Sequence, residues 1–98
     1  DMPPCHRKGD ICTGHSCFPP RPSIQGSPNV FTNAIPQHRL TDAWAVHACG
    51  PPPGHGSVLC AGSPNVFANT LAVGRKGDPV CCGSACATHS PNVFANGP

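Results

Sequence analysis

The sequence predicts an all-β fold made of three repeats, each built from short strands and turns. Gly and Pro number 11 and 14 in a chain of 98 residues and interrupt it at short intervals. No segment therefore keeps the i, i+3, i+4, i+7 apolar spacing of a helix. The pentapeptide Ser-Pro-Asn-Val-Phe occurs three times, which chance does not produce. A repeat architecture of strands and turns follows from these two observations.

An Arg and an Asp three positions apart precede each copy of the pentapeptide, and we call this pair the head of the repeat. The heads are Arg7–Asp10, Arg39–Asp42 and Arg75–Asp78, and the pentapeptides are Ser27–Phe31, Ser63–Phe67 and Ser90–Phe94. The segments between them differ in length, and such insertions belong in loops on a shared scaffold. We expect one domain over residues 2–98, with repeats at approximately 7–36, 38–73 and 74–97.

Each pentapeptide ends in a β-branched and an aromatic residue, which favour a strand. An Asn follows each pentapeptide, and because Asn tolerates positive φ we expect tight turns there, the strongest at Asn96-Gly97. The three turn residues are Asn33, Asn69 and Asn96. A chain with four Phe and one Trp must pack its aromatic side chains, so we expect the pentapeptide Phe residues in the core. They are Phe31, Phe67 and Phe94.

The chain is poor in material for an apolar core. Leu, Ile, Val and Phe together number 17. Burial of apolar surface stabilises a fold by about 25 cal/mol per Å². With so few large apolar residues, this cannot readily offset a backbone entropy cost of about 1–2 kcal/mol per residue. The sequence also contains eight Cys and six His. Disulfides or a metal site are therefore expected to stabilise the fold.

Several classes of function are not expected. The formal charge of +2 is too small and dispersed for nucleic-acid binding. No apolar run has the length of a membrane helix, and no signal peptide indicates export by the general secretory route. No orienting carboxylate or oxyanion loop accompanies a Cys–His pair, and no Gly-rich phosphate loop is present, so we do not expect an enzyme.

The Cys and His residues follow the repeats. His15 and His47 each lie five positions after a head Asp, and the third repeat presents Cys81 and Cys82 instead. If the heads superpose about a pseudo-threefold axis, both His side chains and one of these thiolates meet near one point. His55 could supply a fourth ligand. Imidazole and thiolate ligands suit a tetrahedral Zn²⁺ ion, and a site closed by four ligands is structural.

The other Cys and His residues have simpler interpretations. We expect five cysteines to be small buried apolar residues: Cys12, Cys17, Cys49, Cys60 and Cys86. His6 and His38, beside the heads, are expected on the solvated surface. The alternative for the whole chain is a small secreted binding module with a disulfide framework, and a redox or metal-trafficking protein is a further alternative.

The heads and pentapeptides together resemble the PAAR-repeat proteins, the spike tips of type VI secretion systems and contractile phage tails. The resemblance covers essentially the whole chain. It implies a small cone with a flat β base and a pointed apex stabilised by one structural Zn²⁺ ion. Three His and one Cys hold the zinc in that family, which implies His15, His47, His55 and Cys82 here. Cys82 precedes Gly83, as in the family's Cys-Gly pattern, while Cys81 stays open as the alternative.

The resemblance implies a structural tip that caps a trimeric β-helical spike, VgrG or its phage counterpart. The partner-binding residues would be Val30, Phe31, Val66, Phe67, Val93 and Phe94. Effector proteins and transient contact with the target membrane are further implied. The protein would be cytoplasmic before assembly and then at the tip of the injection machine, in a target cell or a virion tail. The sequence ends four residues after Phe94, so no appended toxin domain is expected.

Two departures from the family pattern stand out. The second head has Thr41-Asp42 in place of Gly-Asp, and no Pro-Ala-Ala-Arg run follows the first two pentapeptides. The third pentapeptide is preceded by His89, where the others have Gly26 and Gly62. If these glycines adopt positive φ, His89 is expected to be strained.

Overall fold

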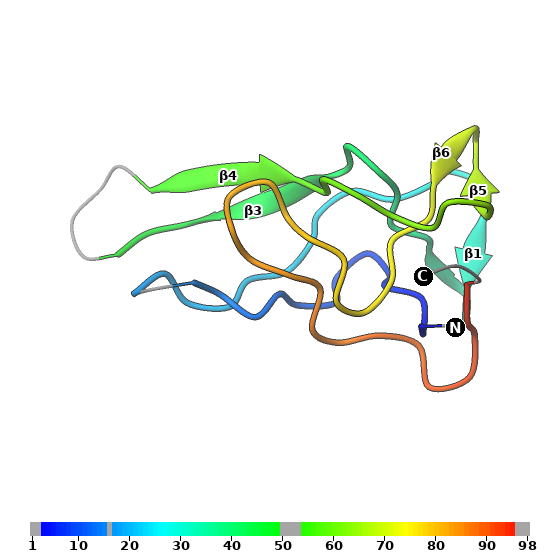
Figure 1. Cartoon of the computed structure of the whole chain (residues 1–98), viewed down its shortest axis with the longest axis horizontal. Helices are drawn as coiled ribbons and strands as arrows, with labels where there is room; N and C mark the ends of the chain where they lie inside the picture. Colours follow the sequence, from blue (N-terminus) through cyan, green and yellow to red (C-terminus); the bar gives the residue numbers. More distant parts are fainter. Residues whose placement is uncertain (1–2, 16, 50–53, 96–98) are drawn as a thin grey trace.

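The computed structural model describes residues 3–15, 17–49 and 54–95, and within these ranges it contains strands and turns without a helix (Figure 1). The strands are β1 (Phe31–Thr32), β2 (Ile35–Pro36), β3 (Ala43–His47), β4 (His55–Val58), β5 (Phe67–Ala68) and β6 (Leu71–Ala72). They form three antiparallel pairs: β1 with β2, β3 with β4 and β5 with β6. The all-β prediction is confirmed. A search of the same ranges found no helix able to cross a membrane.

Two of the pairs are hairpins with two-residue turns. Asn33 and Ala34 have φ of 55° and 62°, and Asn69 and Thr70 have φ of 53° and 66°. Positive φ at both central residues is the type I′ geometry, whose twist matches that of the flanking strands. The turns expected at Asn33 and Asn69 are confirmed, whereas Asn96 and Gly97 lie outside the described residues.

The third pentapeptide has no strand partner next to it in the sequence and pairs instead with residues near the N-terminal end. Pro4 forms an antiparallel bridge with Phe94, and the Cys5 amide donates to the Val93 carbonyl at 2.9 Å. The same bond runs from Gln37 to Val30 and from Val73 to Val66 in the two hairpins. Residues 3–5 therefore take the place that β2 and β6 have in the other repeats, beside the third pentapeptide.

A closed cycle of backbone hydrogen bonds joins the three repeats at the residue before each head. The His6 amide donates to the Gly74 carbonyl at 2.9 Å, and Gly74 donates to His38 at 2.9 Å. His38 completes the cycle by donating to the His6 carbonyl at 3.3 Å. Because each residue donates to one neighbour and accepts from the other, the cycle marks the pseudo-threefold axis.

The repeated residues make the same contacts in each repeat. The Ser27 hydroxyl accepts hydrogen bonds from the amides of Asn29 and Val30, and Ser63 and Ser90 do the same in their pentapeptides. Each head forms a two-pronged ion pair, with Arg39 Nε 2.8 Å and Nη2 2.9 Å from the Asp42 carboxylate. The head arginine also donates to the carbonyl before a neighbouring pentapeptide. These bonds are Arg7 to His89, Arg39 to Gly26 and Arg75 to Gly62. The repeated motif thus fastens the repeats to one another.

The expected burial of the pentapeptide Phe residues is wrong. Phe31, Phe67 and Phe94 are 55%, 57% and 49% exposed. Side chains alternate along a strand, and in β1 and β5 the inward positions belong to Thr32 and Ala68. In the first hairpin the Thr32 hydroxyl donates to the Gln37 side chain at 2.6 Å, so a hydrogen-bonded polar pair is buried there while Phe31 stays exposed.

The surface positions expected for His6 and His38 are also wrong, since both side chains are fully buried. They lie on the axis and pack against Trp44, with ring centroids 4.9 Å and 5.1 Å away. His6 Nδ1 is 2.9 Å from the Thr88 carbonyl, and His38 Nδ1 is 2.8 Å from that of Gln25. Burial and the nearby His38 lower the pKa of His6 to about 4. Burial also lowers the pKa of His38.

Gly26 and Gly62 do not have the positive φ that the sequence suggested. Their reason is close packing, because a Cβ at Gly26 would lie 2.9 Å from Pro36 Cβ, and one at Gly62 would lie 2.6 Å from the Val73 carbonyl oxygen. The segment opposite the third pentapeptide is residues 3–5. His89 does not have a positive φ, so the strain expected for its backbone is not found.

Candidate functional site

The pairs β1–β2 and β5–β6 and residues 93–95 lie at one end of the molecule, and the β3–β4 pair projects toward the other (Figure 1). The long axis between these ends measures 39 Å. Residues 12–15 and 17–18 run beside β3–β4 at the projecting end (Figure 1). We call the first end the base and the second the tip, and each carries one candidate site.

The tip brings together the four residues predicted as metal ligands. His55 Nε2 lies 3.1 Å from His15 Nε2 and 2.7 Å from His47 Nε2. One ligand atom from each of His15, His47, His55 and Cys82 lies within 4.8 Å of the others. This is the one such group of three or more potential ligand residues in the part of the chain that the structure describes.

Local backbone geometry places the imidazoles. His47 ends β3 and His55 begins β4, and the two residues pair across the strands after an irregularity in register. A Cβ at Gly54 would overlap the His47 carbonyl, so this approach requires glycine. His15 exchanges backbone hydrogen bonds with Phe18 at 3.1 Å and 2.8 Å, following Gly14 at a φ of 74°.

Phe18 covers the imidazole cluster and was missed by the sequence reasoning. Its ring centroid lies 4.9 Å from His15, 5.0 Å from His47 and 4.4 Å from His55. The available signal is that Phe18 is the one Phe outside the pentapeptides. An apolar ring beside the nitrogen atoms limits water access and strengthens electrostatic interactions there.

The hydrogen bonds of the imidazoles leave a place for a cation. His47 Nδ1 donates to the Pro19 carbonyl at 2.8 Å, so a neutral His47 directs its Nε2 lone pair into the cluster. His55 Nε2 carries at most one hydrogen and cannot donate well to both His15 and His47. Desolvation and the adjacent imidazoles of His47 and His15 lower the pKa of His55, which favours the neutral form of the ring.

Arg21 is the second residue that the sequence reasoning missed. Its buried guanidinium donates to Cys12 Sγ at 3.0 Å and to Cys82 Sγ at 3.2 Å, and its carbon lies 5.4 Å from the Trp44 ring centroid. The same guanidinium therefore contacts one buried sulfur and one sulfur of the imidazole cluster. Arg21 is the one basic residue outside the repeat heads and their adjoining lysines, which is the signal in the sequence.

Cys12 lies on the buried side of Arg21. Burial alone would raise the pKa of the Cys12 thiol, but hydrogen bonds from Ser84, Arg21 and Gly14 outweigh it and lower that pKa. In Cys86, which pairs with Cys12 across an antiparallel bridge, burial dominates and raises the thiol pKa. The predicted burial of Cys12 and Cys86 is confirmed.

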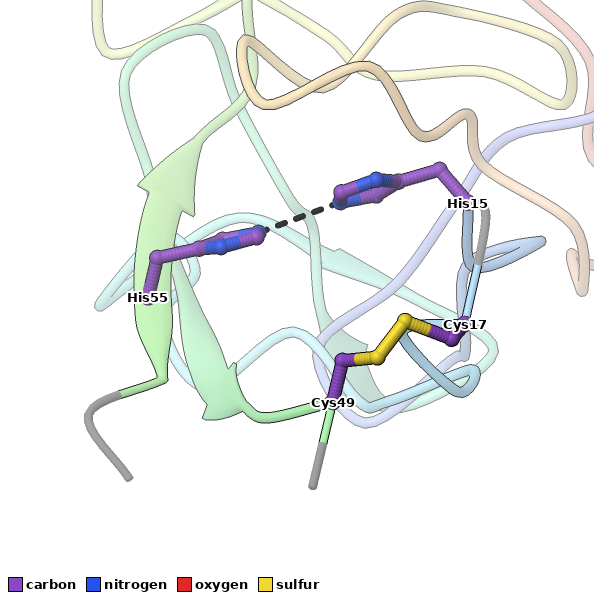
Figure 2. The surroundings of a disulfide bond; sticks show 4 residues. All are labelled: His15, Cys17, Cys49 and His55. Atoms are coloured by element: carbon purple, nitrogen blue, oxygen red, sulfur yellow. Dashed lines mark hydrogen bonds between the residues drawn. A yellow bond between two sulfur atoms is a disulfide. The ribbon is translucent and has the colours of Figure 1, made fainter. Parts of the chain in front are cut away.

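The predictions for Cys17, Cys49 and Cys60 are wrong, because these residues form disulfides. Cys17 is bonded to Cys49, and Cys60 is bonded to Cys81. Figure 2 shows the Cys17–Cys49 bond close to the facing rings of His15 and His55. The spacing His-x-Cys in two repeats thus places a cross-link beside two imidazoles, which a view of cysteine as a small apolar residue overlooks.

The disulfides also bear on the alternatives left open by the sequence. Cys81 is bonded to Cys60, so among the two adjacent cysteines it is Cys82 that joins the imidazole cluster. Of the eight cysteines, four are paired and four are free, which differs from a framework of four disulfides.

The base carries the second candidate site, an exposed apolar surface. The rings of Phe31, Phe67 and Phe94 occupy equivalent positions in the three pairings, and each is about half exposed. Val30 and Val93 are exposed beside them, whereas Val66 packs partly against the small cluster of Cys5, Ala68, Val73 and Ala95. Five of the six residues predicted to bind a partner are therefore exposed at this end, and Val66 is half-buried.

These features define a small all-β repeat protein with three equivalent exposed Phe rings at one end and a His/Cys cluster at the other. The chain belongs to the PAAR motif family, whose pattern matches residues 13–85. This structural family is associated with the spike tips of type VI secretion systems and other contractile machines. A comparison with curated proteins found no match.

Proposed function

We propose that this protein is a structural spike tip whose base caps a trimeric β-helical spike and whose tip is stabilised by one zinc ion. The observation that carries the proposal is the placement of Phe31, Phe67 and Phe94, which repeats the same exposed ring three times within one chain. A monomer of this kind can offer an equivalent contact to each subunit of a symmetric trimer.

The backbone at the base supports the same partner. The pairings in the base are only two residues long in β1–β2 and β5–β6, so they bury little by themselves. Extending each strand with a strand of the spike would add main-chain hydrogen bonds, while the Phe rings would supply the apolar contact. VgrG of a type VI system and the corresponding phage spike both have the required trimeric form.

The residues at the tip fit a zinc ion. Zn–N bonds of 2.0–2.1 Å place the nitrogen atoms of a tetrahedral site roughly 3.3 Å apart. The Nε2 spacings of 3.1 Å and 2.7 Å are close to this value. His15, His47 and His55 would bind through Nε2 and Cys82 through Sγ. Zinc in a closed site would stabilise the fold by about 10–16 kcal/mol, as in zinc-finger peptides, and we propose no enzymatic role.

The remaining steps follow from a role as a tip. The protein would fold in the cytoplasm, join the spike there and leave with it when the machine contracts. Its projecting end would then meet the target membrane first, and effector proteins would travel with the assembled spike.

Capping is tested by mixing the purified protein with a purified trimeric β-helical spike protein of the VgrG type and measuring the mass of the complex. We expect one chain per trimer. Phe31→Asp, Phe67→Asp and Phe94→Asp should each weaken binding, and the triple variant should abolish it. Val46→Asp is the matched control, because Val46 is 68% exposed but lies on β3 away from the base rings. Undiminished binding by the triple variant would contradict the proposal.

Zinc binding is tested by native mass spectrometry of the folded protein, where we expect one zinc per chain. His47→Ala should lose that zinc and lower the melting temperature sharply, since a buried ligand on β3 is removed. His89→Ala is the control, because His89 bonds to its own neighbour at Ser90 rather than to the cluster. Equal zinc content in both variants would count against the site.

A further inference from the structure

The two disulfides occupy positions that relate directly to the four tip ligands. Cys17 lies two positions after His15, and Cys49 lies two positions after His47. Their bond therefore joins the segments that carry these two imidazoles (Figure 2). Cys81 is adjacent to Cys82, and its bond to Cys60 joins the Cys82 segment to the chain just beyond β4, which begins with His55. Each disulfide thus connects one pair of ligands.

We propose that the two disulfides preorganise the tip site, so that the redox state of the cysteines sets how tightly the chain holds its metal. This inference rests on the zinc site proposed above and adds its regulation. Oxidation would make the metal-holding conformation the ground state of the chain. After reduction, the conformational entropy lost in bringing the ligands together would oppose metal binding and weaken it.

Chain lengths give the size of the effect. His15 and His47 are 32 positions apart along the backbone, but each lies only two positions from a cross-linked cysteine. His55 and Cys82 are 27 positions apart, and the second disulfide shortens that connection comparably. Loop-closure probability falls with about the 3/2 power of length, so each shortening should raise the metal affinity roughly 10-fold, and both together roughly 100-fold.

The disulfide-bonded residues lie nearer the surface than most of the free cysteines. Cys17, Cys60 and Cys81 are exposed and Cys49 is half-buried, whereas the free cysteines Cys5, Cys12 and Cys86 are buried. A dithiol reductant would attack one sulfur, and exchange would leave two Cys thiols and the reductant's own disulfide. To form the disulfide, two Cys thiols pass two protons and two electrons to an oxidised disulfide carrier, which leaves as its dithiol.

The test measures zinc affinity by competition with a chromophoric chelator on the oxidised full chain. We expect about 10-fold weaker zinc binding in the double variant Cys17→Ser/Cys49→Ser and in Cys60→Ser/Cys81→Ser, and about 100-fold in the fourfold variant. Cys5→Ala is the matched control, since Cys5 is a free cysteine packed in the base cluster. Its affinity should stay within about twofold of the parent, and equal affinity in every variant would overturn the inference.

A second measurement avoids variants that do not fold. Zinc-loaded parent protein is treated with a phosphine reductant, and the rate of zinc transfer to the chelator is followed alongside fluorescence of buried Trp44. Reduction should accelerate transfer at least about 10-fold. An unchanged rate after both disulfides are reduced overturns the inference while leaving the zinc site in place. Oxidised parent protein that binds no zinc overturns the proposed site, and this inference falls with it.

Discussion

The base and the tip of this protein are stabilised in different ways. The base uses the same contacts three times: a Ser hydroxyl that caps its pentapeptide, an Arg–Asp ion pair and one bond of the central cycle. The tip uses contacts that occur once each, among them an imidazole cluster, two disulfides and a buried guanidinium. The base is therefore pseudo-threefold symmetric, whereas the tip is built from residues that differ between the repeats.

The difference indicates what each end can tolerate. A lost contact in the base leaves two equivalent ones in place, and the three repeats still close around the axis. A lost ligand or cross-link at the tip has no equivalent elsewhere in the described residues. We therefore expect variants at the two ends to separate stability of the base from metal content of the tip.

Among variants outside the tip, the largest effect is expected from breaking the ion pair of a head. Asp42 is buried and its carboxylate accepts three hydrogen bonds from Arg39, so Asp42→Asn leaves a buried cation poorly paired. The free energy of unfolding should fall by about 3–5 kcal/mol, measured by urea denaturation of the zinc-saturated protein. Asp78→Asn should cost a similar amount, and zinc content should not change. A loss below about 1 kcal/mol at both positions would contradict the role of the heads.

The second largest effect is expected from acid, which should lower the free energy of unfolding by protonating His6 on the axis. The pKa of His6 is about 4 in the folded protein, against an ordinary value of 6.5. Its neighbours are His38, Arg7, Asp10, Thr88, Ser23 and Trp44. The unfolded chain therefore binds a proton between pH 6.5 and 4 that the folded chain excludes. The stability contributed by neutral His6 is complete above pH 6.5 and is lost as the pH falls through this window, by about 3 kcal/mol.

His6→Gln isolates this contribution from the protonation of the tip ligands. Urea unfolding of the parent and the variant at several pH values should show curves that converge by about 3 kcal/mol on acidification. Parallel curves would show that His6 keeps its ordinary pKa in the folded state.

The smallest expected effect is an increase in stability from relieving backbone strain in a hairpin turn. Thr70 is β-branched and has a φ of 66°, which costs on the order of 1–3 kcal/mol in strain. Gly removes the strain at an entropic cost of roughly 0.5–1 kcal/mol, so Thr70→Gly should raise the free energy of unfolding by about 0.5–1 kcal/mol. Ala61→Gly is the control, at an exposed position without positive φ, and should be destabilising. A loss on Thr70→Gly would show that the Thr70 contacts outweigh its strain.

The sequence predicts the repeated parts of this molecule well. The strands at the first two pentapeptides and the turns at Asn33 and Asn69 depend on local preferences, which the residues of both copies have. Repetition indicated that His15, His47 and one thiolate from Cys81 or Cys82 would meet, because equivalent positions lie about an axis. The family resemblance supplied the full set of His15, His47, His55 and Cys82, which the structure brings together.

The failures concern which way a residue faces. The position before a head looks exposed beside charged residues, yet it lies on the axis, where His6 and His38 are buried against Trp44. Phe31 and Phe67 look like core residues, yet strand alternation gives the interior to Thr32 and Ala68. Neither outcome follows from local preference, because both depend on how three repeats pack together. The disulfides depend in the same way on distances between loops of unequal length.

The pairing of Pro4 with Phe94 has a consequence for synthesis on the ribosome. A growing chain can form β1–β2 and β5–β6 as soon as each hairpin emerges, since their partners are adjacent in sequence. The third side of the base cannot form until residues near 94 have emerged to meet residues 3–5, which were made much earlier. A product truncated before residue 94 therefore keeps an open base, and only a chain that includes this segment presents three equivalent sides.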